Sequence, residues 1–240
     1  MYQDFTSSGV GINFKAGFIY RPIPVLRLGF AIHTPTYYDL DAYANNNVSA
    51  KFTELPVEDA KPTEKFEYGE SAWTDYSYKL KTPWRLMASA ATVLGQRAII
   101  SFDYEYVDYT TAKYSNDGAK NEYLETNNAI KAIYKSTHNF RAGAEYRFNS
   151  VFCLRGGYAY SASPYTKGEM NEKNDIQTIT GGLGLNFGVF YADLAYLHKN
   201  SKLNGLFYYY ETSKGEVIES PEFQTKFKDN EFRLTLGIRF

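Results

Sequence analysis

The stretch Phe-Arg-Leu-Thr-Leu-Gly-Ile-Arg-Phe, residues 232–240, decides the fold class of this chain. Because a β-strand points successive side chains to opposite faces, this alternation predicts a strand with one apolar and one polar face. A final aromatic residue on such a strand is typical of the closing strand of an outer-membrane barrel, and Phe240 is the expected signature residue. The large apolar side chains occupy every even position: Phe232, Leu234, Leu236, Ile238 and Phe240.

The same alternation recurs along the chain and predicts about nine strands, each near the ~9–11 residues that cross a bilayer at a tilt. Alternation alone also fits a soluble β-sandwich, in which the apolar faces would pack against a second layer of the same molecule. The other predicted strands cover residues 10–21, 26–33, 84–91, 98–107, 140–148, 154–161, 179–187 and 191–196.

The connections between the predicted strands alternate between short and long. Short periplasmic turns and long extracellular loops are typical of bacterial outer-membrane barrels, whereas a soluble meander has no reason to sort its loops. We therefore predict an all-β fold, an antiparallel up-and-down transmembrane barrel. The short connections are 21–24, 94–96, 149–150 and Gly188, and the long ones are roughly 35–81, 110–137, 164–175 and 199–230.

Composition narrows the function. Lys plus Arg number 26 and Asp plus Glu 27, so a net charge of -1 gives no indication of nucleic-acid binding. The 23 tyrosines and 17 phenylalanines include many at strand ends, where they suit the lipid–water boundary, although tyrosine is also a good strand former. One cysteine, three dispersed histidines and the lack of a catalytic motif predict no metal, no cofactor and no enzymatic activity.

The strand count and the N-terminus suggest a longer protein. The first residues lack the basic start, apolar stretch and cleavage site of a secretory signal. Bacterial single-chain barrels have even numbers of strands, whereas the pattern in this chain predicts an odd number of strands. We expect residues 1–240 to be one barrel domain, the C-terminal portion of its parent, with unpaired edges at 10–20 and 232–240.

The polar faces of the strands carry charges of both signs, which we expect to line the lumen. Lone buried charges are costly, so pairs of Asp103 or Glu105 with Arg85 or Arg141 are expected. A ladder of such pairs would brace the wall, whereas an open wet lumen would leave the charges as a selectivity lining; we favour bracing. The network comprises Arg27, Arg85, Asp103, Glu105, Arg141, Glu145, Arg147, Arg155, Asp193 and Arg233.

One long loop carries a helical pattern. Leu124, Ile130 and Ile133 have near-helical spacing, with Tyr123 and Tyr134 beside them. The spacing predicts a short amphipathic helix over the mouth of the barrel. This helix either collects an acyl chain or covers the extracellular end.

Several segments resemble the FadL/TodX/OmpP1 family of outer-membrane transporters. Residues 80–85, Leu-Lys-Thr-Pro-Trp-Arg, resemble its L-x-T-P-x-R entry to a strand, and residues 101–109 resemble the next strand of a Bacteroidetes-like branch. Residues 140–147, 154–158 and 163–164 are similar to its R-x-G-x-E-Y-R, L-R-x-G-Y and S-P elements. The resemblance implies a barrel of about fourteen strands, plugged by an N-terminal hatch whose Asn-Pro-Ala signature is not matched here.

The same resemblance implies a function in a Gram-negative outer membrane. We expect passive uptake of hydrophobic small molecules such as long-chain fatty acids. An anchor or shuttle for type IX-like secretion and a general porin are the alternatives. The expected partners are the lipid bilayer, a hydrophobic ligand and the barrel-assembly machinery, which would contact the C-terminal strand.

Overall fold

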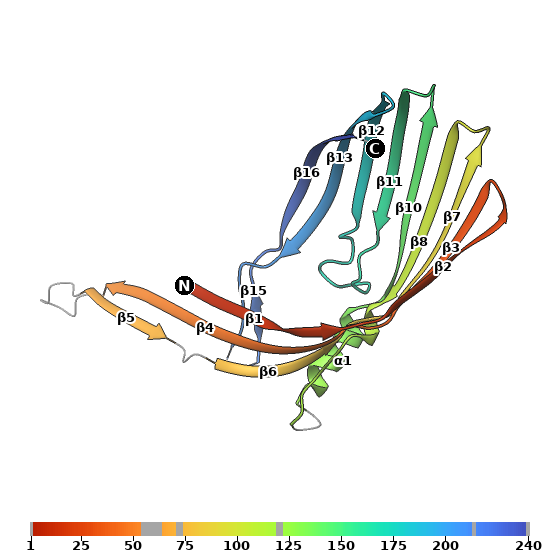
Figure 1. Cartoon of the computed structure of the whole chain (residues 1–240). Coiled ribbons are helices and arrows are strands. Elements are labelled where there is room, and N and C mark those ends of the chain that lie inside the picture. The colour runs from red at the N-terminus through yellow and green to blue at the C-terminus, as the bar shows by residue number, and fades with distance from the viewer. Residues whose placement is uncertain (1, 54–63, 71–73, 119–121, 213–214, 239–240) are drawn as a thin grey trace, which may run out of the picture.

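The computed structural model describes residues 2–53, 64–70, 74–118, 122–212 and 215–238. Its main feature is a curled sheet of nine strands in the order β16-β13-β12-β11-β10-β8-β7-β3-β2, with every neighbouring pair antiparallel (Figure 1). These strands are β2 (Lys15–Ile23), β3 (Leu26–His33), β7 (Arg85–Leu94), β8 (Ala98–Asp108), β10 (Ser136–Arg147), β11 (Phe152–Ser161), β12 (Ile176–Asn186), β13 (Phe190–Gly205) and β16 (Phe223–Ile238).

One side of this sheet, the apolar face, carries the alternating large apolar residues and faces outward. On β16, Phe232, Leu234 and Leu236 are 73%, 65% and 71% exposed. Cross-strand pairs such as Tyr196 with Phe232, whose ring centroids are 4.9 Å apart, cover this face. Among the described residues, only Ala42, Val107 and Ile130 are buried hydrophobic side chains. The apolar face therefore packs against no second layer, and the β-sandwich alternative is wrong.

The short and long connections between strands lie at opposite ends of the sheet, as predicted. The short turns all lie at one end of the sheet, together with the last described residues of β16, and the long connections lie at the other end (Figure 1). The tight turns use left-handed backbone at Gly95 and Gly188, whose φ angles are 55° and 84°. The described residues contain no helix of the length and hydropathy needed to cross a membrane.

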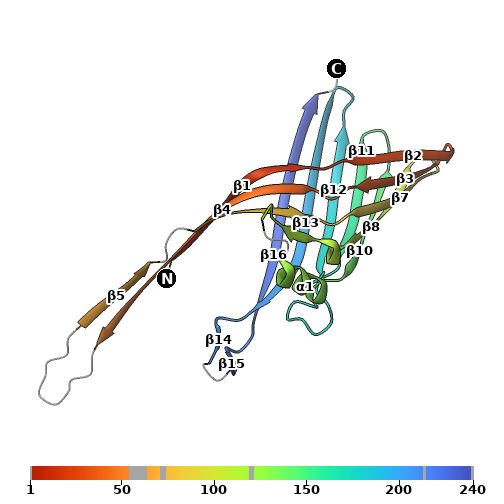
Figure 2. The same ribbon diagram turned by 90° about the horizontal axis from the view of Figure 1, so that it is seen from below.

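The long connection predicted at 35–81 does join β3 to β7, but most of its described residues form extended strand rather than loop. It forms β4 (Tyr37–Thr53), β5 (Glu64–Glu70) and β6 (Thr74–Lys81), which pair with β1 (Tyr2–Ile12) and β9 (Lys113–Ser115). We call these five strands the arm. Its order β1-β4-β6-β9 repeats the order β2-β3-β7-β8 of the main sheet, and it leaves that sheet at the long-loop end (Figures 1 and 2).

A line of breaks separates the arm from the main sheet. Two Thr-Pro pairs lie on this line, and proline cannot donate to a strand ladder. The Thr34 hydroxyl accepts the N–H of Phe14 at 2.8 Å, and the Thr82 hydroxyl accepts the N–H of Thr36 at 2.8 Å. The strand predicted from residue 10 is thus two strands, β1 and β2, with the break at residues 13–14.

Two further long connections differ from the prediction in detail. The ladder between β13 and β16 continues to the pair Gly205 and Phe223, so much of the predicted loop 199–230 is strand. The rest contains the small hairpin β14 (Tyr209–Glu211) and β15 (Val217–Glu219). The predicted helix is present as α1 (Leu124–Ile133), preceded by the short helix η1 (Tyr109–Thr111).

Candidate functional site

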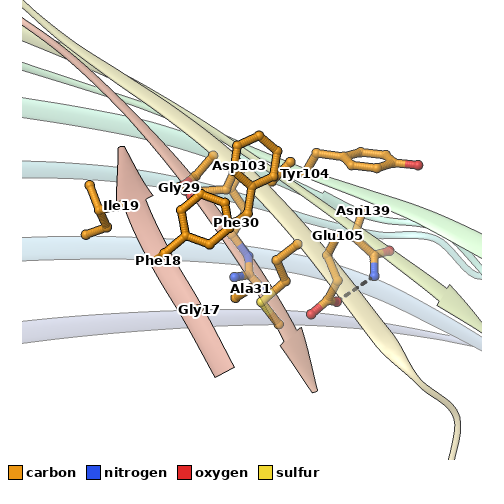
Figure 3. Close-up of a pocket in the computed structure, with 14 residues that line it drawn as sticks. Gly17, Phe18, Ile19, Gly29, Phe30, Ala31, Asp103, Tyr104, Glu105 and Asn139 are labelled. Carbon is orange, nitrogen blue, oxygen red and sulfur yellow. Dashed lines mark hydrogen bonds between the residues drawn. The ribbon is translucent and has the colours of Figure 1, made fainter. Parts of the chain in front are cut away.

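The face opposite the apolar face carries the predicted charged residues, and we call it the charged face. Near the β2 edge it contains a hollow of about 600 Å³ between β2, β3, β7, β8 and β10 (Figure 3). Small or apolar side chains form one part of the hollow, and polar or charged side chains from β7, β8 and β10 form the other. The charged-face lining comprises Gly17, Ile19, Gly29, Ala31, Met87, Ser89, Asp103, Glu105, Asn139 and Arg141.

Glycine keeps this hollow open. Gly29 faces the hydroxyl of Ser89, and a Cβ on Gly29 would collide with that oxygen. Gly17 lies beside it on β2, opposite Ala31 in register. Four residues of the apolar face also contribute to the lining, namely Phe18, Phe30, Ala88 and Tyr104.

The charges around the hollow are only partly paired. The Asn139 side chain donates to Glu105 Oε1 at 3.0 Å, and Arg85 Nη1 lies 3.9 Å from Glu105 Oε2. Asp103 and Arg141 are directly opposite in register, yet they form no ion pair in the described part of the chain. The expected Arg85–Glu105 pair is therefore present, whereas the expected Asp103–Arg141 pair is not formed.

A second group of charges braces the wall at the short-turn end. Glu145 on β10 accepts from Arg147 Nε at 2.7 Å and from Arg155 Nε on β11 at 2.8 Å. Arg155 also pairs with Asp193 on β13, reaching across β12. Gly184 of β12 makes this possible, because a Cβ there would lie 2.9 Å from Asp193 Oδ1 and 3.3 Å from Arg155 Nη1.

The two remaining predicted charges lie outside this network. Arg233 pairs with Glu231 of its own strand at 2.5 Å, and Glu231 was not among the predicted residues. Arg27 lies opposite Ala91 and forms no ion pair within the described residues. Asn139 was also missed, because a single amide at an inward position carries no sequence signal before strand register is known.

The helix α1 is tied to its surroundings on two sides. The Asn127 side chain both donates to the carbonyl of Tyr114 and accepts its N–H, each at 2.8 Å. On the other side the N–H of Thr166 donates to the carbonyl of Ile133 at 2.8 Å. These bonds place α1 at the end of the sheet where the long connections gather (Figure 1).

The five predicted mouth residues have different environments. Ile130 is buried and Leu124 is exposed, while Ile133, Tyr123 and Tyr134 are half-buried. Burial raises the pKa of the Tyr123 phenol, and burial with a hydrogen bond to Tyr165 raises the pKa of Tyr134. The Tyr123 ring stacks on Tyr114 at 5.9 Å, which links α1 to β9.

The site offers binding groups, whereas no metal-binding cluster is found. Within the described ranges, no group of three or more His, Cys, Asp or Glu side chains is placed to hold a metal ion. The predicted signature residue Phe240 lies outside the described residues. The hollow near β2 combines apolar walls with the guanidinium of Arg141, which has no ion-pair partner among the described residues; this combination suits an amphipathic ligand.

Comparisons with known proteins give one family match and two similar solved structures. Residues 2–186 match the sequence profile of the family described as outer membrane protein transport protein (OMPP1/FadL/TodX). The crystal structure of a Pseudomonas aeruginosa FadL homologue superposes with a TM-score of 0.52 at 10% identity, covering 97% of this chain and 68% of that chain. The Pseudomonas putida toluene transporter TodX gives a TM-score of 0.49 at 13% identity, covering 97% of this chain and 50% of that chain. No curated protein matches the sequence.

Proposed function

Since the chain belongs to the OMPP1/FadL/TodX family of outer-membrane transport proteins, we propose that it takes up long-chain fatty acids passively through its barrel. The family resides in the Gram-negative outer membrane, moves hydrophobic compounds and is not enzymatic. The exposed apolar face of the nine-stranded sheet fits this location, because contact with lipid makes such a surface favourable.

The hollow near β2 is the observation that carries the substrate class. Its volume of about 600 Å³ lies within the usual range of small-molecule sites, roughly 300–1,000 Å³. Ile19, Ala31 and Met87 offer apolar surface for an acyl chain. Arg141 offers a planar guanidinium, which binds a carboxylate through two parallel hydrogen bonds. An amphipathic acid matches both parts at once.

The braced end of the charged face argues against a general porin. A polar pore needs free charges along a wet path. Glu145, Arg155 and Asp193 are instead engaged with one another. This part of the wall supports the barrel, and the apolar hollow supplies the route for cargo.

We also propose that residues 1–240 are a single barrel domain, the C-terminal portion of a larger barrel in the Bacteroidetes-like branch. Two observations support this. β2 and β16 are the edges of the main sheet among the described residues, and a membrane barrel needs its edges paired. The chain also spans 68% of the FadL homologue. The barrel-assembly machinery would then recognise the terminal strand with Phe240.

Uptake of two matched probes tests the proposal. Cells expressing the whole protein are given labelled oleate or the corresponding alcohol, which lacks the carboxylate. We expect Arg141→Gln to weaken oleate binding about tenfold or more, since hydrogen bonds to a charged group contribute ~1.5–3 kcal/mol. The alcohol should be unaffected, as should the control Arg233→Gln, because Arg233 lies outside the hollow.

Three outcomes would contradict the proposal. Uptake equal to that of an empty vector would remove the transport function. Equal effects of Arg141→Gln on the acid and on the alcohol would remove the carboxylate contact. A co-purifying protein partner with no bound lipid would favour the secretion anchor instead.

A further inference from the structure

Four lysines surround a second hollow, of about 400 Å³, at the long-loop end of β12, β13 and β16. Lys202 and Lys226 are directly opposite in the β13–β16 ladder, and Lys228 is two residues further along β16. Lys173, in the loop before β12, lines the same hollow. We call Lys173, Lys202, Lys226 and Lys228 the lysine cluster; all four side chains are exposed.

The lysine cluster lies on the apolar face. The ladder between β13 and β16 runs without a register shift from the pair Phe190 and Ile238 to the pair Gly205 and Phe223. Even-numbered residues of both strands therefore share one face throughout. Lys202, Lys226 and Lys228 thus point to the same side as Leu234 and Phe232, the side that contacts lipid.

The position of the cluster along the strand matches the lipid headgroups. Lys228 lies ten residues before Ile238 on β16, which corresponds to about 33 Å along the strand and about 25 Å along the membrane normal at a typical tilt. The apolar band of an outer-membrane barrel is also about 25 Å tall. Lys228 therefore reaches the edge of the hydrocarbon layer, and Lys202 and Lys226 lie one pair beyond it.

The lysines of the cluster have no ion-pair partner among the described residues. Asp175 is the one carboxylate in the lining, and it already accepts the N–H of Ser163 at 2.8 Å. Like charges placed directly opposite on a sheet are destabilising, so an external anion would relieve Lys202 and Lys226.

We propose that the lysine cluster binds the phosphate groups of the phosphorylated glycolipid in the outer leaflet of the outer membrane. The long-loop end of a bacterial barrel is extracellular, so the cluster faces this leaflet. The side-chain amides of Asn200 and Gln177 line the same hollow and offer further donors to a phosphate or sugar oxygen. The lipid's acyl chains would then lie along the apolar face below the cluster.

The test compares the intact protein with two variants in nanodiscs, titrated with a bisphosphorylated lipid A and with the same glycolipid after phosphate removal. The first variant combines Lys202→Gln, Lys226→Gln and Lys228→Gln. The control is Lys199→Gln, a neighbouring residue of β13 whose side chain lies on the opposite face, across from Asp229. Native mass spectrometry counts the bound lipid.

We expect the triple variant to lose about a hundredfold in affinity for the phosphorylated lipid, since each lysine near an anionic lipid surface contributes roughly fivefold. The control should bind as the unmodified protein does, and added salt should weaken binding. Unchanged binding by the triple variant would overturn the proposal. Equal affinity for the dephosphorylated lipid, or full displacement by millimolar inorganic phosphate, would also overturn it.

A folding failure would not obscure the result. Removing like charges should leave the barrel folded, which a gel-mobility shift on heating reports. If the triple variant does not fold, the single substitution Lys228→Gln provides the measurement, with an expected loss of about fivefold. An unchanged affinity of that single variant would contradict the proposal in the same way.

Discussion

Arg155 joins three strands of the wall, so its removal should weaken the barrel measurably. Its side chain is 45% exposed, while its partners Glu145 and Asp193 are 18% and 31% exposed. Fully exposed ion pairs contribute about 0.2–1 kcal/mol, and hydrogen bonds to charged groups contribute about 1.5–3 kcal/mol. Two half-exposed pairs fall between these limits. We therefore expect Arg155→Gln to lower the free energy of unfolding by about 2 kcal/mol.

A double-mutant cycle separates the ion pair from the packing of the arginine stem. Reversible urea unfolding in lipid vesicles is measured for Arg155→Gln, Asp193→Asn and the double variant. We expect a coupling energy of about 1 kcal/mol. Gly184→Ala offers an independent route to the same pair, since its new Cβ would lie 2.9 Å from Asp193 Oδ1. In that background the coupling should disappear.

A coupling energy near zero would refute the bracing argument. If Arg155→Gln were then still destabilising, the effect would come from the aliphatic stem of the side chain rather than from its charge. Arg233→Gln is the matched control, because Arg233 pairs only with Glu231 of its own strand and crosses no interface between strands. It should change stability by less than about 0.5 kcal/mol.

Three further predictions follow from the two faces and the long-loop end. Thr82→Ala removes the acceptor of the Thr36 N–H, so hydrogen exchange at that amide should accelerate about fivefold, whereas Thr82→Ser should keep it slow. Leu234→Lys on the apolar face should cost about 2–4 kcal/mol in vesicle unfolding, while Thr235→Lys on the charged face should cost less than about 1 kcal/mol. The pKa of Tyr134 is raised, so its contribution to stability should be full below the ordinary tyrosine pKa of about 10 and be lost as pH rises through the folded value. An ultraviolet titration should therefore lose its late-ionising phenol in Tyr134→Phe.

The strands of the main sheet could be predicted because alternation is a local property. Each strand carries its own two-faced pattern, so Leu234 and Leu236 identify the apolar face without knowledge of any partner strand. The alternation of short and long connections then indicated the direction in which each strand crosses the membrane. The family resemblance contributed the class of cargo, which no pattern of apolar residues specifies.

The arm was missed because its pattern is interrupted at the Thr-Pro pairs. Proline normally ends a strand, and residues 35–81 are also rich in polar side chains. The structure shows that the hydroxyls of Thr34 and Thr82 accept the N–H groups of Phe14 and Thr36 where the ladder is interrupted. These side-chain hydrogen bonds depend on which strand lies next to each threonine, and the sequence alone does not reveal that neighbour.

The charged network was predicted as a set of residues, but only one of the expected pairs, Arg85 with Glu105, is present. Simple register would pair Asp103 with Arg141, which are opposite one another. Arg155 and Asp193 instead pair across an intervening strand, which requires Gly184 between them. The long side chain of Arg155 reaches past the adjacent strand because Gly184 has no side chain in between. Strand register alone therefore does not determine which residues form ion pairs.

This division of the charged face has a consequence for transport. Where the face is braced, Glu145 and Arg155 neutralise each other and stiffen the wall. Where glycine leaves a hollow, Arg141, on the same strand as Glu145, lies beside apolar side chains and forms no ion pair in the part of the chain that the structure describes. The ion pairs of Glu145 therefore hold β10 in place. Arg141, at the hollow, is four residues away on the same strand, which corresponds to about 13 Å. A cation fixed in this way loses little freedom when it meets a carboxylate, so the stiffness of one region favours binding in the other.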